Sequence, residues 1–119
     1  MVTLALAGLI AAASAQIKVE NAWVRATVPQ QQATGAFMKI TSPETVKLMS
    51  VTTALAKINE IHEMKMVGEV MKMRAHPNGL EIRANTTMEL KPGGYHIMMM
   101  ELEQTIKAGS VVPLRLEFM

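Results

Sequence analysis

The chain has 119 residues, half of them hydrophobic, which is enough for one domain with a single core. Its formal net charge is +2, and its 12 basic residues are scattered rather than clustered as in a nucleic-acid groove. It contains no cysteine, which excludes disulfides, thiolate zinc sites, iron–sulfur clusters and cysteine-based blue-copper centres. Every acidic residue is a glutamate, which excludes EF-hand loops and Ser-His-Asp triads.

The first segment of the chain, residues 1–15, is apolar and ends in Ala13-Ser14-Ala15, a pattern typical of a signal-peptide cleavage site. It is shorter than the roughly 20 residues that a membrane-spanning helix needs. We therefore expect residues 1–15 to be a signal-peptide remnant and residues 16–119 to form an exported domain outside the cytoplasm, without stable membrane insertion. The alternative is a buried N-terminal helix.

Short segments of alternating or continuous apolar residues follow, and each is bounded by turn residues. They are residues 17–24, 35–40, 45–51, 58–66, 69–74, 80–83, 87–90, 95–102 and 111–118. Segments of this length, separated by turn signals every 8–12 residues or so, are typical of an antiparallel β-sandwich or barrel.

Four local features lead to further structural expectations. Alternation places Ile17, Val19 and Trp23 on one face of the first segment. Residues 53–58 could form one helical turn, and Pro77-Asn78-Gly79 is a strong hairpin signal before residues 80–83. Pro113 indicates an edge or a bulge in the last strand.

Histidine and methionine recur at every second position in three segments, and a strand sends such residues to the same face. The sets that share a face are His62, Met64 and Met66; Met71 and Met73; and His96, Met98 and Met100. Met99 points to the opposite face of its strand. Because 58–66 and 69–74 are separated by a Val67-Gly68 turn signal, we expect these two segments to be neighbours in a hairpin.

The chemistry of these side chains points to a soft metal. Thioether sulfur and imidazole nitrogen together suit Cu(I), whereas magnesium, calcium and manganese prefer oxygen ligands. The competing interpretation is that methionine, a flexible side chain, simply fills the core. The third histidine, His76, lies in a turn with no methionine on its face, and we interpret it as a surface residue.

The spacing of four of these residues resembles a known signature. His62, ten residues, Met73, twenty-two residues and His96-x-Met98 resemble the H-x10-M-x21-H-x-M pattern of periplasmic copper chaperones of the PCu(A)C family, with the second spacer one residue longer. The flanking segments NAWVRATVP, TGAFMKI and LKPGGYHIMMM also match, and the resemblance covers residues 17–119.

The resemblance implies an all-β, single-domain, cupredoxin-like Greek-key antiparallel β-sandwich that binds one Cu(I). Carried over by position, the ligands are His62, Met73, His96 and Met98, and the remaining methionines are not carried over. It further implies a chaperone that delivers copper by ligand exchange, either to the dinuclear copper centre of a cytochrome c oxidase subunit or to another copper chaperone. We expect a monomer.

Two other classes of function compete with copper carriage. A metal-free β-sandwich that serves as a binding or structural module would use methionine only as core volume. An enzyme is disfavoured, because cysteine and aspartate are absent and no nucleophile motif surrounds any serine. Glu63 also points away from His62 by alternation, so it is a poor partner for orienting that histidine.

Overall fold

The computed structural model describes residues 2–6 and 16–119, which form ten strands and no helix. The strands are β1 (Val2–Leu6), β2 (Lys18–Val24), β3 (Ala33–Thr41), β4 (Val46–Thr52), β5 (Ala56–Val67), β6 (Val70–Ala75), β7 (Leu80–Ile82), β8 (Thr87–Leu90), β9 (Tyr95–Leu102) and β10 (Val111–Phe118). Within these residues there is accordingly no helix of the length and apolar character that crossing a membrane requires.

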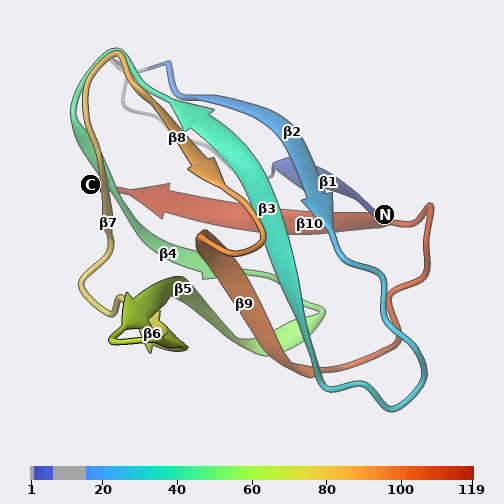
Figure 1. Ribbon diagram of the computed structural model, residues 1–119. Coiled ribbons are helices and arrows are strands. Elements are labelled where there is room, and N and C mark those ends of the chain that lie inside the picture. Colours follow the sequence, from blue (N-terminus) through green and yellow to red (C-terminus); the bar gives the residue numbers. More distant parts are fainter. Residues whose placement is uncertain (1, 7–15) are drawn as a thin grey trace.

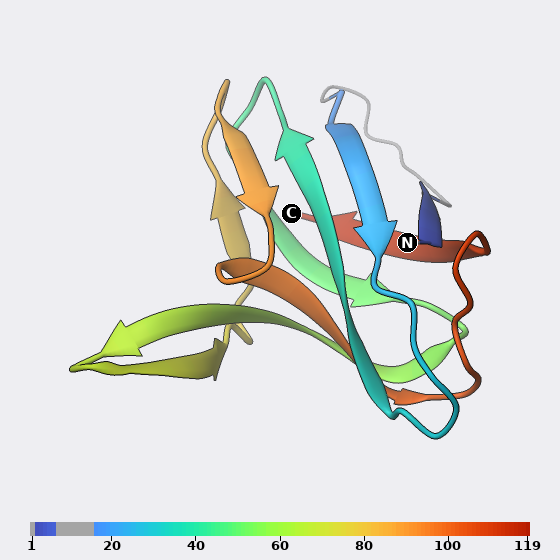
Figure 2. The same ribbon diagram turned by 45° about the vertical axis from the view of Figure 1, so that its right-hand side comes forward.

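The strands are arranged in two layers. The layers are joined at one side, where β1 pairs with both β2 and β10. Their order is β6-β5-β9-β3-β2-β1-β10-β4-β7, and β8 pairs with β3 off this path. Figures 1 and 2 show β2, β3 and β9 in one layer, with β10 and β4 behind them. In the described part of the chain every pairing of named strands is antiparallel except that of β1 with β10. The predicted single-domain, cupredoxin-like β-sandwich is confirmed.

The core lies between the layers and follows the alternation of the strands. Its largest fully buried side chains include Ile40, Leu48, Ile82, Leu90, Ile97, Met99, Ile106 and Leu114. Burying a side chain of this size contributes about 1.5–3 kcal/mol relative to leaving it exposed. The chain therefore obtains its stability from aliphatic and thioether packing.

The expected face of Trp23 is wrong, and a bulge in β2 is the reason. The register between β2 and β3 shifts just before Trp23, and Asn21 has a positive φ of 52°. Val19 lies opposite Ile40 on the core side, whereas Trp23 lies opposite Phe37 on the other face. Because a bulge adds one residue to one strand, it reverses the alternation beyond it.

The hairpin expected at Pro77-Asn78-Gly79 is also wrong. β6 pairs with β5 and β7 pairs with β4, so this turn carries the chain from one layer to the other. Gly79 has a φ of +90°, and a Cβ there would lie 2.8 Å from the carbonyl oxygen of Leu48. The glycine is therefore required by a close crossing rather than by a hairpin.

Two further local expectations meet different outcomes. Residues 53–55 form a turn and β5 begins at Ala56, so the helical turn expected at 53–58 is absent. Pro113 lies opposite Ala5 of β1, and the pairing of β10 with β4 begins only at Arg115. The missing N–H of Pro113 therefore interrupts no pairing with β4, as expected of a proline beside an unpaired strand segment.

The N-terminal segment contributes β1, which lies between β2 and β10. Residues 2–6 are thus a strand, and the alternative of an N-terminal helix is wrong for them. Residues 1 and 7–15, which include the Ala13-Ser14-Ala15 motif, lie outside the described residues. The signal peptide over residues 1–15 and the domain boundary at residue 16 stay predictions.

The predicted hairpin of 58–66 with 69–74 is confirmed as β5 and β6. Val67 lies opposite Val70, so Gly68 and Glu69 form a two-residue turn in which Gly68 has a positive φ of 65°. The pairing of β5 with β9 ends at Glu63. Beyond Glu63, β5 pairs with β6 alone. Figure 2 shows this hairpin projecting from the body of the molecule.

Candidate metal centre

The structure brings the four predicted ligands onto one face of three adjacent strands. His62 of β5 lies directly opposite His96 of β9, and Met73 of β6 lies opposite Met64 of β5. Directly opposite residues share a face, and so do residues two apart on one strand. Met98 therefore accompanies His96, and Met64 accompanies His62. We call this face, which points away from the core, the ligand face.

The two imidazoles lie at the spacing of rings that share a metal. Their ring centres are 5.8 Å apart and their planes meet at 68°. Because a metal lies about 2 Å from each imidazole nitrogen, two rings on one ion have centres roughly 5–6 Å apart. The backbone pairing of β5 with β9 thus sets this spacing without any bound ion.

Each histidine has one ring nitrogen held by an oxygen acceptor. The Nε2 of His62 donates a hydrogen bond of 2.8 Å to Oε1 of Glu60, and its buried Nδ1 has no hydrogen-bond partner in the described part of the chain. The Nδ1 of His96 donates to the carbonyl oxygen of Gly94 at 3.1 Å. Metal-bound histidines usually have this arrangement, because the held nitrogen fixes the tautomer and leaves the other lone pair free.

The site is closed on the histidine side and open on the hairpin side. The side chain of His62 is 12% exposed, and His96 is 6% exposed. Met98 is half-buried, whereas Met73 is 47% exposed. An ion that reaches the histidines without a change in the fold therefore passes the thioethers first.

Aromatic side chains cover the other side of His96. The ring centre of Phe37 lies 6.3 Å from that of His96, and Trp23 packs on Phe37 with ring centres 4.5 Å apart. The guanidinium of Arg25 lies 5.5 Å from the ring centre of Phe37, in cation–π range. The bulge in β2 is what brings Trp23 to this face.

Gly35 makes room for this aromatic packing. It lies opposite Met98 on β3, and a Cβ there would approach Cζ of Phe37 to 2.8 Å. Real side chains do not come that close, so the phenyl ring occupies the space that any larger residue would fill. The glycine therefore places an aromatic edge beside the Met98 position.

The opposite face of β5 carries a separate polar cluster. Glu63 accepts a hydrogen bond of 2.9 Å from Nε2 of His76, whose ring centre lies 5.5 Å from that of Tyr95. The hydrogen bond from His76 lowers the pKa of Glu63 below its usual value of 4.5. Burial raises the pKa of Tyr95, and the charge of Glu63 raises it further. Glu63 thus points away from His62 as expected, but His76 is half-buried rather than a surface residue.

Sequence reasoning missed Glu60. This residue lies two positions before His62, opposite Met98, so alternation alone places its carboxylate on the ligand face. The signal was present in the pattern of positions 60, 62, 64 and 66. The recurrence of histidine and methionine indicates only the nitrogen and sulfur donors, whereas Glu60 is an acceptor that holds one of them.

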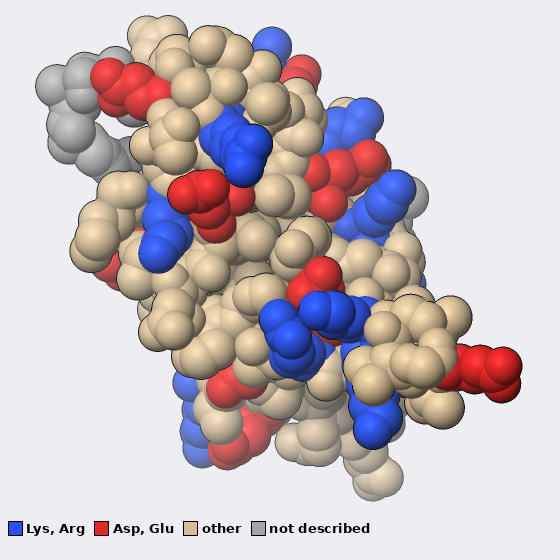
Figure 3. Space-filling model, turned by 60° about the vertical axis from the view of Figure 1, so that its left-hand side comes forward, with Lys and Arg blue, Asp and Glu red and all other residues tan. Residues whose placement is uncertain are grey.

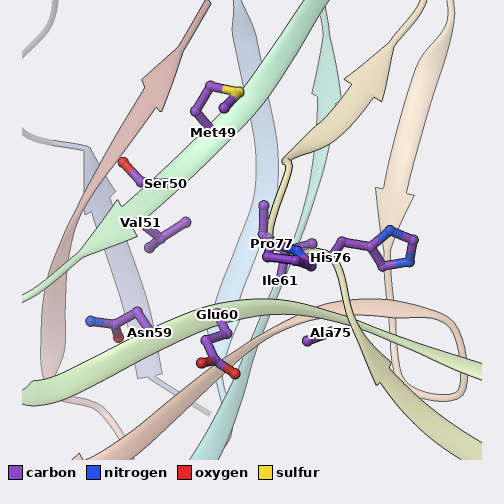
Figure 4. A pocket seen from close by; sticks show the side chains of 9 residues that line it. All are labelled: Met49, Ser50, Val51, Asn59, Glu60, Ile61, Ala75, His76 and Pro77. Carbon is purple, nitrogen blue, oxygen red and sulfur yellow. The ribbon is translucent and has the colours of Figure 1, made fainter.

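A pocket of about 190 Å³ lies between β4, β5 and the β6–β7 connection. It is lined by Met49, Ser50, Val51, Asn59, Glu60, Ile61, Ala75, His76 and Pro77. Figure 4 shows the carboxylate of Glu60 and the ring of His76 both directed away from Val51. None of the four predicted ligands lines this pocket, which is a gap between the layers beside the β6–β7 connection.

Two groups of methionines lie at opposite extremes of exposure. Met38 and Met99 are buried, at 2% and 0% exposed, and act as core side chains. Met66, Met71 and Met73 are 58%, 46% and 47% exposed. Packing in the core therefore accounts for the first group and not for the second.

Residues 17–119 match the family model described as "LpqE-like: Putative lipoprotein LpqE-like". The chain is also 30% identical over 102 residues to "Putative lipoprotein Lxx21020" of Leifsonia xyli subsp. xyli (strain CTCB07). That alignment covers 86% of the chain and 61% of the relative, so the chain spans about three fifths of the relative's length.

Two similar solved structures are PCuAC domains. The copper-bound PCuAC domain from PmoF2 has a TM-score of 0.68 and 17% identity, covering 86% of this chain and 80% of that one. The apo PCuAC domain from PmoF1 has a TM-score of 0.69 and 18% identity, covering 86% and 82%. The resemblance predicted from the sequence is confirmed in the fold. The chain belongs to the LpqE-like family, and it has the fold of the PCuAC domains.

Proposed function

We propose that this domain is a carrier that binds one Cu(I) through His62, Met73, His96 and Met98. The observation that supports it best is the state of the two histidines: each is held at one nitrogen, and among the described residues Nδ1 of His62 has no hydrogen-bond partner. The proposed donors are Nδ1 of His62, Nε2 of His96 and the two thioether sulfurs. This combination of imidazole and thioether suits a soft monovalent ion.

The mechanism that these donors favour is ligand exchange. Thioethers are neutral and need no deprotonation to bind. An acceptor's ligands would replace the exposed Met73 first, because the histidines are recessed. The ion would then leave through the same side of the site. No acid–base or redox step is required of this chain, so we infer that it is not an enzyme.

The envelope is the proposed location, and a copper-accepting protein is the proposed partner. A relative's description as a lipoprotein supports an exported, envelope-associated protein. The two similar domains with known structures, one of them copper-bound, support copper as the cargo. We propose delivery in the periplasm to the dinuclear copper centre of a cytochrome c oxidase subunit or to another copper chaperone. Transfer of Cu(I) to a soluble oxidase fragment would test the recipient: one-electron oxidation of the loaded fragment with ferricyanide should give the visible absorption of a mixed-valence dinuclear centre, whereas an unloaded fragment should stay colourless.

A metal-free binding module is the alternative, and the exposed apolar hairpin favours it. Val67 and Val70 at the turn are 52% and 57% exposed, beside exposed methionines. Such a surface could bind a protein partner without any metal. This alternative predicts no Cu(I) affinity above that of any methionine-rich peptide.

Anaerobic titration of Cu(I) against a competing chelator decides between these two functions. Replacing both His62 and His96 with alanine should lower the affinity roughly 100-fold or more, since second-shell changes alone cost 10–100-fold. His76→Ala is the matched control, because this third histidine lies in the cluster on the opposite face of β5. X-ray absorption of the Cu(I) form should show two nitrogens and two sulfurs. Unchanged affinity in the double variant, or a shell of oxygens alone, would contradict the assignment.

A further inference from the structure

The ligand face continues beyond the proposed site along the hairpin. Next to His62, Met64 lies opposite Met73, and one step further Met66 lies opposite Met71. The four sulfur-bearing residues thus form two cross-strand pairs on the face that carries the histidines. The opposite face of the same hairpin segment carries Lys65, Val67, Val70, Lys72 and Arg74 and no methionine.

Core packing does not explain these pairs. Met66 and Met71 are more than two fifths exposed, and the strands that carry them extend past the last pairing of β5 with β9. Figure 2 shows this part of the hairpin standing clear of the body. A side chain here needs neither volume nor apolar character to stabilise the fold, so the choice of a thioether at both positions has another cause.

We propose that Met66 and Met71 form a second, thioether-only site for Cu(I), which loads the histidine site through the Met64–Met73 pair. This inference rests on the proposed copper-carrying function. It extends that function, because it assigns a binding and relay role to three methionines that the family signature leaves out.

The spacing of the pairs fits movement from one pair to the next. Directly opposite residues have Cβ atoms about 4.5–5.5 Å apart, so two flexible thioethers can meet on one ion. Successive pairs on one face are about 6.6 Å apart along the strand. Each step is short enough for the next pair to bind the ion before the previous pair has released it. Met73 belongs both to the inner pair and to the proposed histidine site.

The distribution of charge favours movement toward the histidines. Glu60 lies on the ligand face beside His62, at the inner end of the path. Lys65 and Lys72 lie opposite each other on the back of the hairpin, between the two methionine pairs in the sequence. They lie between the two pairs and repel a cation at either one, and Glu69 in the turn attracts a cation to the outer pair. The two ends differ because only the inner one adds the histidine nitrogens and the carboxylate of Glu60. Figure 3 shows basic side chains close to this projecting part of the molecule. The outer site should therefore be the weaker one.

Accessibility supplies a reason for an outer site. The histidine side chains are 12% and 6% exposed, whereas the outer methionines face solvent. A donor protein that cannot reach the histidine nitrogens can still hand an ion to Met66 and Met71. The path from these residues to His62 follows one strand, so no change in the fold is needed.

The test uses Ag⁺ as a stable substitute for Cu(I), with ¹³C-methyl methionine NMR on the whole chain. The protein should bind two equivalents of Ag⁺, and the weaker one should shift the methyl signals of Met66 and Met71. The double variant Met66→Leu/Met71→Leu keeps the volume and apolar area but removes both sulfurs. It should bind one equivalent with unchanged affinity, and its histidine site should load several-fold more slowly in stopped-flow experiments.

The control variant Val67→Ser/Val70→Ser changes the apolar surface of the same turn and keeps all the sulfurs. It should bind two equivalents and load at the normal rate. If the valine variant slows loading and the leucine variant does not, the hairpin is a docking surface for a protein, and the proposal is wrong. It is equally wrong if the unaltered chain binds only one equivalent, or if the leucine variant keeps the second.

A last variant separates this inference from the proposed function. Replacing His62 and His96 with alanine should abolish the strong equivalent and leave the shifts of Met66 and Met71 with Ag⁺ intact. If both equivalents persist in that variant, the histidine site is wrong while the outer site stands. If the outer shifts vanish with the histidines, the outer pair is no independent site, and the inference fails.

Discussion

The interior of the sandwich and the tip of the β5–β6 hairpin use the same residue in opposite ways. Met38 and Met99 are buried between the layers, whereas Met66 and Met71 stand in solvent on a ribbon of two strands. All four lie on strands, where successive side chains point to opposite faces. The comparison shows that alternation assigns a methionine to a face, and that only the neighbouring strands decide whether this face is core or surface.

The same contrast occurs between two adjacent residues. Met99 packs in the core, while Met98 lies on the ligand face beside the aromatic ring of Phe37. One peptide bond therefore separates a residue that holds the fold together from one proposed to hold a metal. Substitutions at the two kinds of position should separate stability from copper binding.

The largest effect is expected from Met99→Ala. Removing this fully buried side chain leaves a cavity and should lower the free energy of unfolding by about 2–5 kcal/mol. Met73→Ala, at an exposed position, should change it by no more than about 0.5 kcal/mol. Urea unfolding of the metal-free proteins measures both. Comparable losses at the two positions would break the distinction drawn between core and hairpin methionines.

Gly35→Ala should give the next largest effect. The added Cβ collides with the ring of Phe37, which must move away from Met98 at a cost of about 1–3 kcal/mol. Because Trp23 packs on that ring, its fluorescence should change as well. Gly94→Ala is the control, since a Cβ there would meet nothing closer than 3.7 Å. A silent Gly35 variant would show that the ligand face is packed as loosely as the hairpin tip.

Glu60→Ala sharpens the comparison from the side of binding. It removes the acceptor for Nε2 of His62 and should weaken Cu(I) binding about 10–100-fold, while the stability of the metal-free protein changes little because the carboxylate is half exposed. Glu60→Gln keeps an oxygen acceptor at this position and should lose less. The chelator competition described above measures both variants, and equal losses would argue for a role of the charge rather than of the hydrogen bond.

The smallest effect concerns pH and the back of β5. The hydrogen bond from His76 depresses the pKa of Glu63 below 4.5 in the folded chain, so the ionised form is preferred there. The stabilisation of the folded chain by ionised Glu63 is complete above pH 4.5 and is lost as the pH falls through the depressed pKa of Glu63. Glu63→Gln should flatten this part of the stability–pH curve by less than about 1 kcal/mol, because the pair is partly exposed. If the stability of the Glu63→Gln variant fell more steeply at low pH than that of the unaltered chain, the prediction would be wrong.

Strand positions and faces were predictable because they depend on short-range alternation. The separation of Met98 from Met99 is an example, and it needed no knowledge of the partner strands. Trp23 was assigned to the wrong face because one residue in a positive-φ conformation, Asn21, reverses the alternation after it. Asparagine adopts a positive φ more readily than most residues, but alternation alone does not distinguish a bulge at Asn21 from a regular strand.

Pairing between distant strands was less predictable. The chemistry of Pro77-Asn78-Gly79 indicates a reversal of the chain, but it does not say which strands the reversal joins. Here it joins the two layers. The pairing of His62 with His96 likewise depends on β5 and β9 being neighbours, which the spacing of the residues could not establish. The family resemblance implied that these two histidines meet, and the register of β5 with β9 shows that they lie directly opposite each other.

The two-residue turn at Gly68 and Glu69 has a consequence for engineering. Because the last backbone hydrogen bond from this hairpin to the body runs from the N–H of Met64 to Gly94, the hairpin beyond Met64 and Met73 is an arm whose length is independent of the sandwich. Residues added symmetrically in multiples of two on each strand would preserve every existing face, whereas a single insertion in one strand would turn over the side chains beyond it. The arm could thus be lengthened or shortened by two residues per strand at a time without a change in the core.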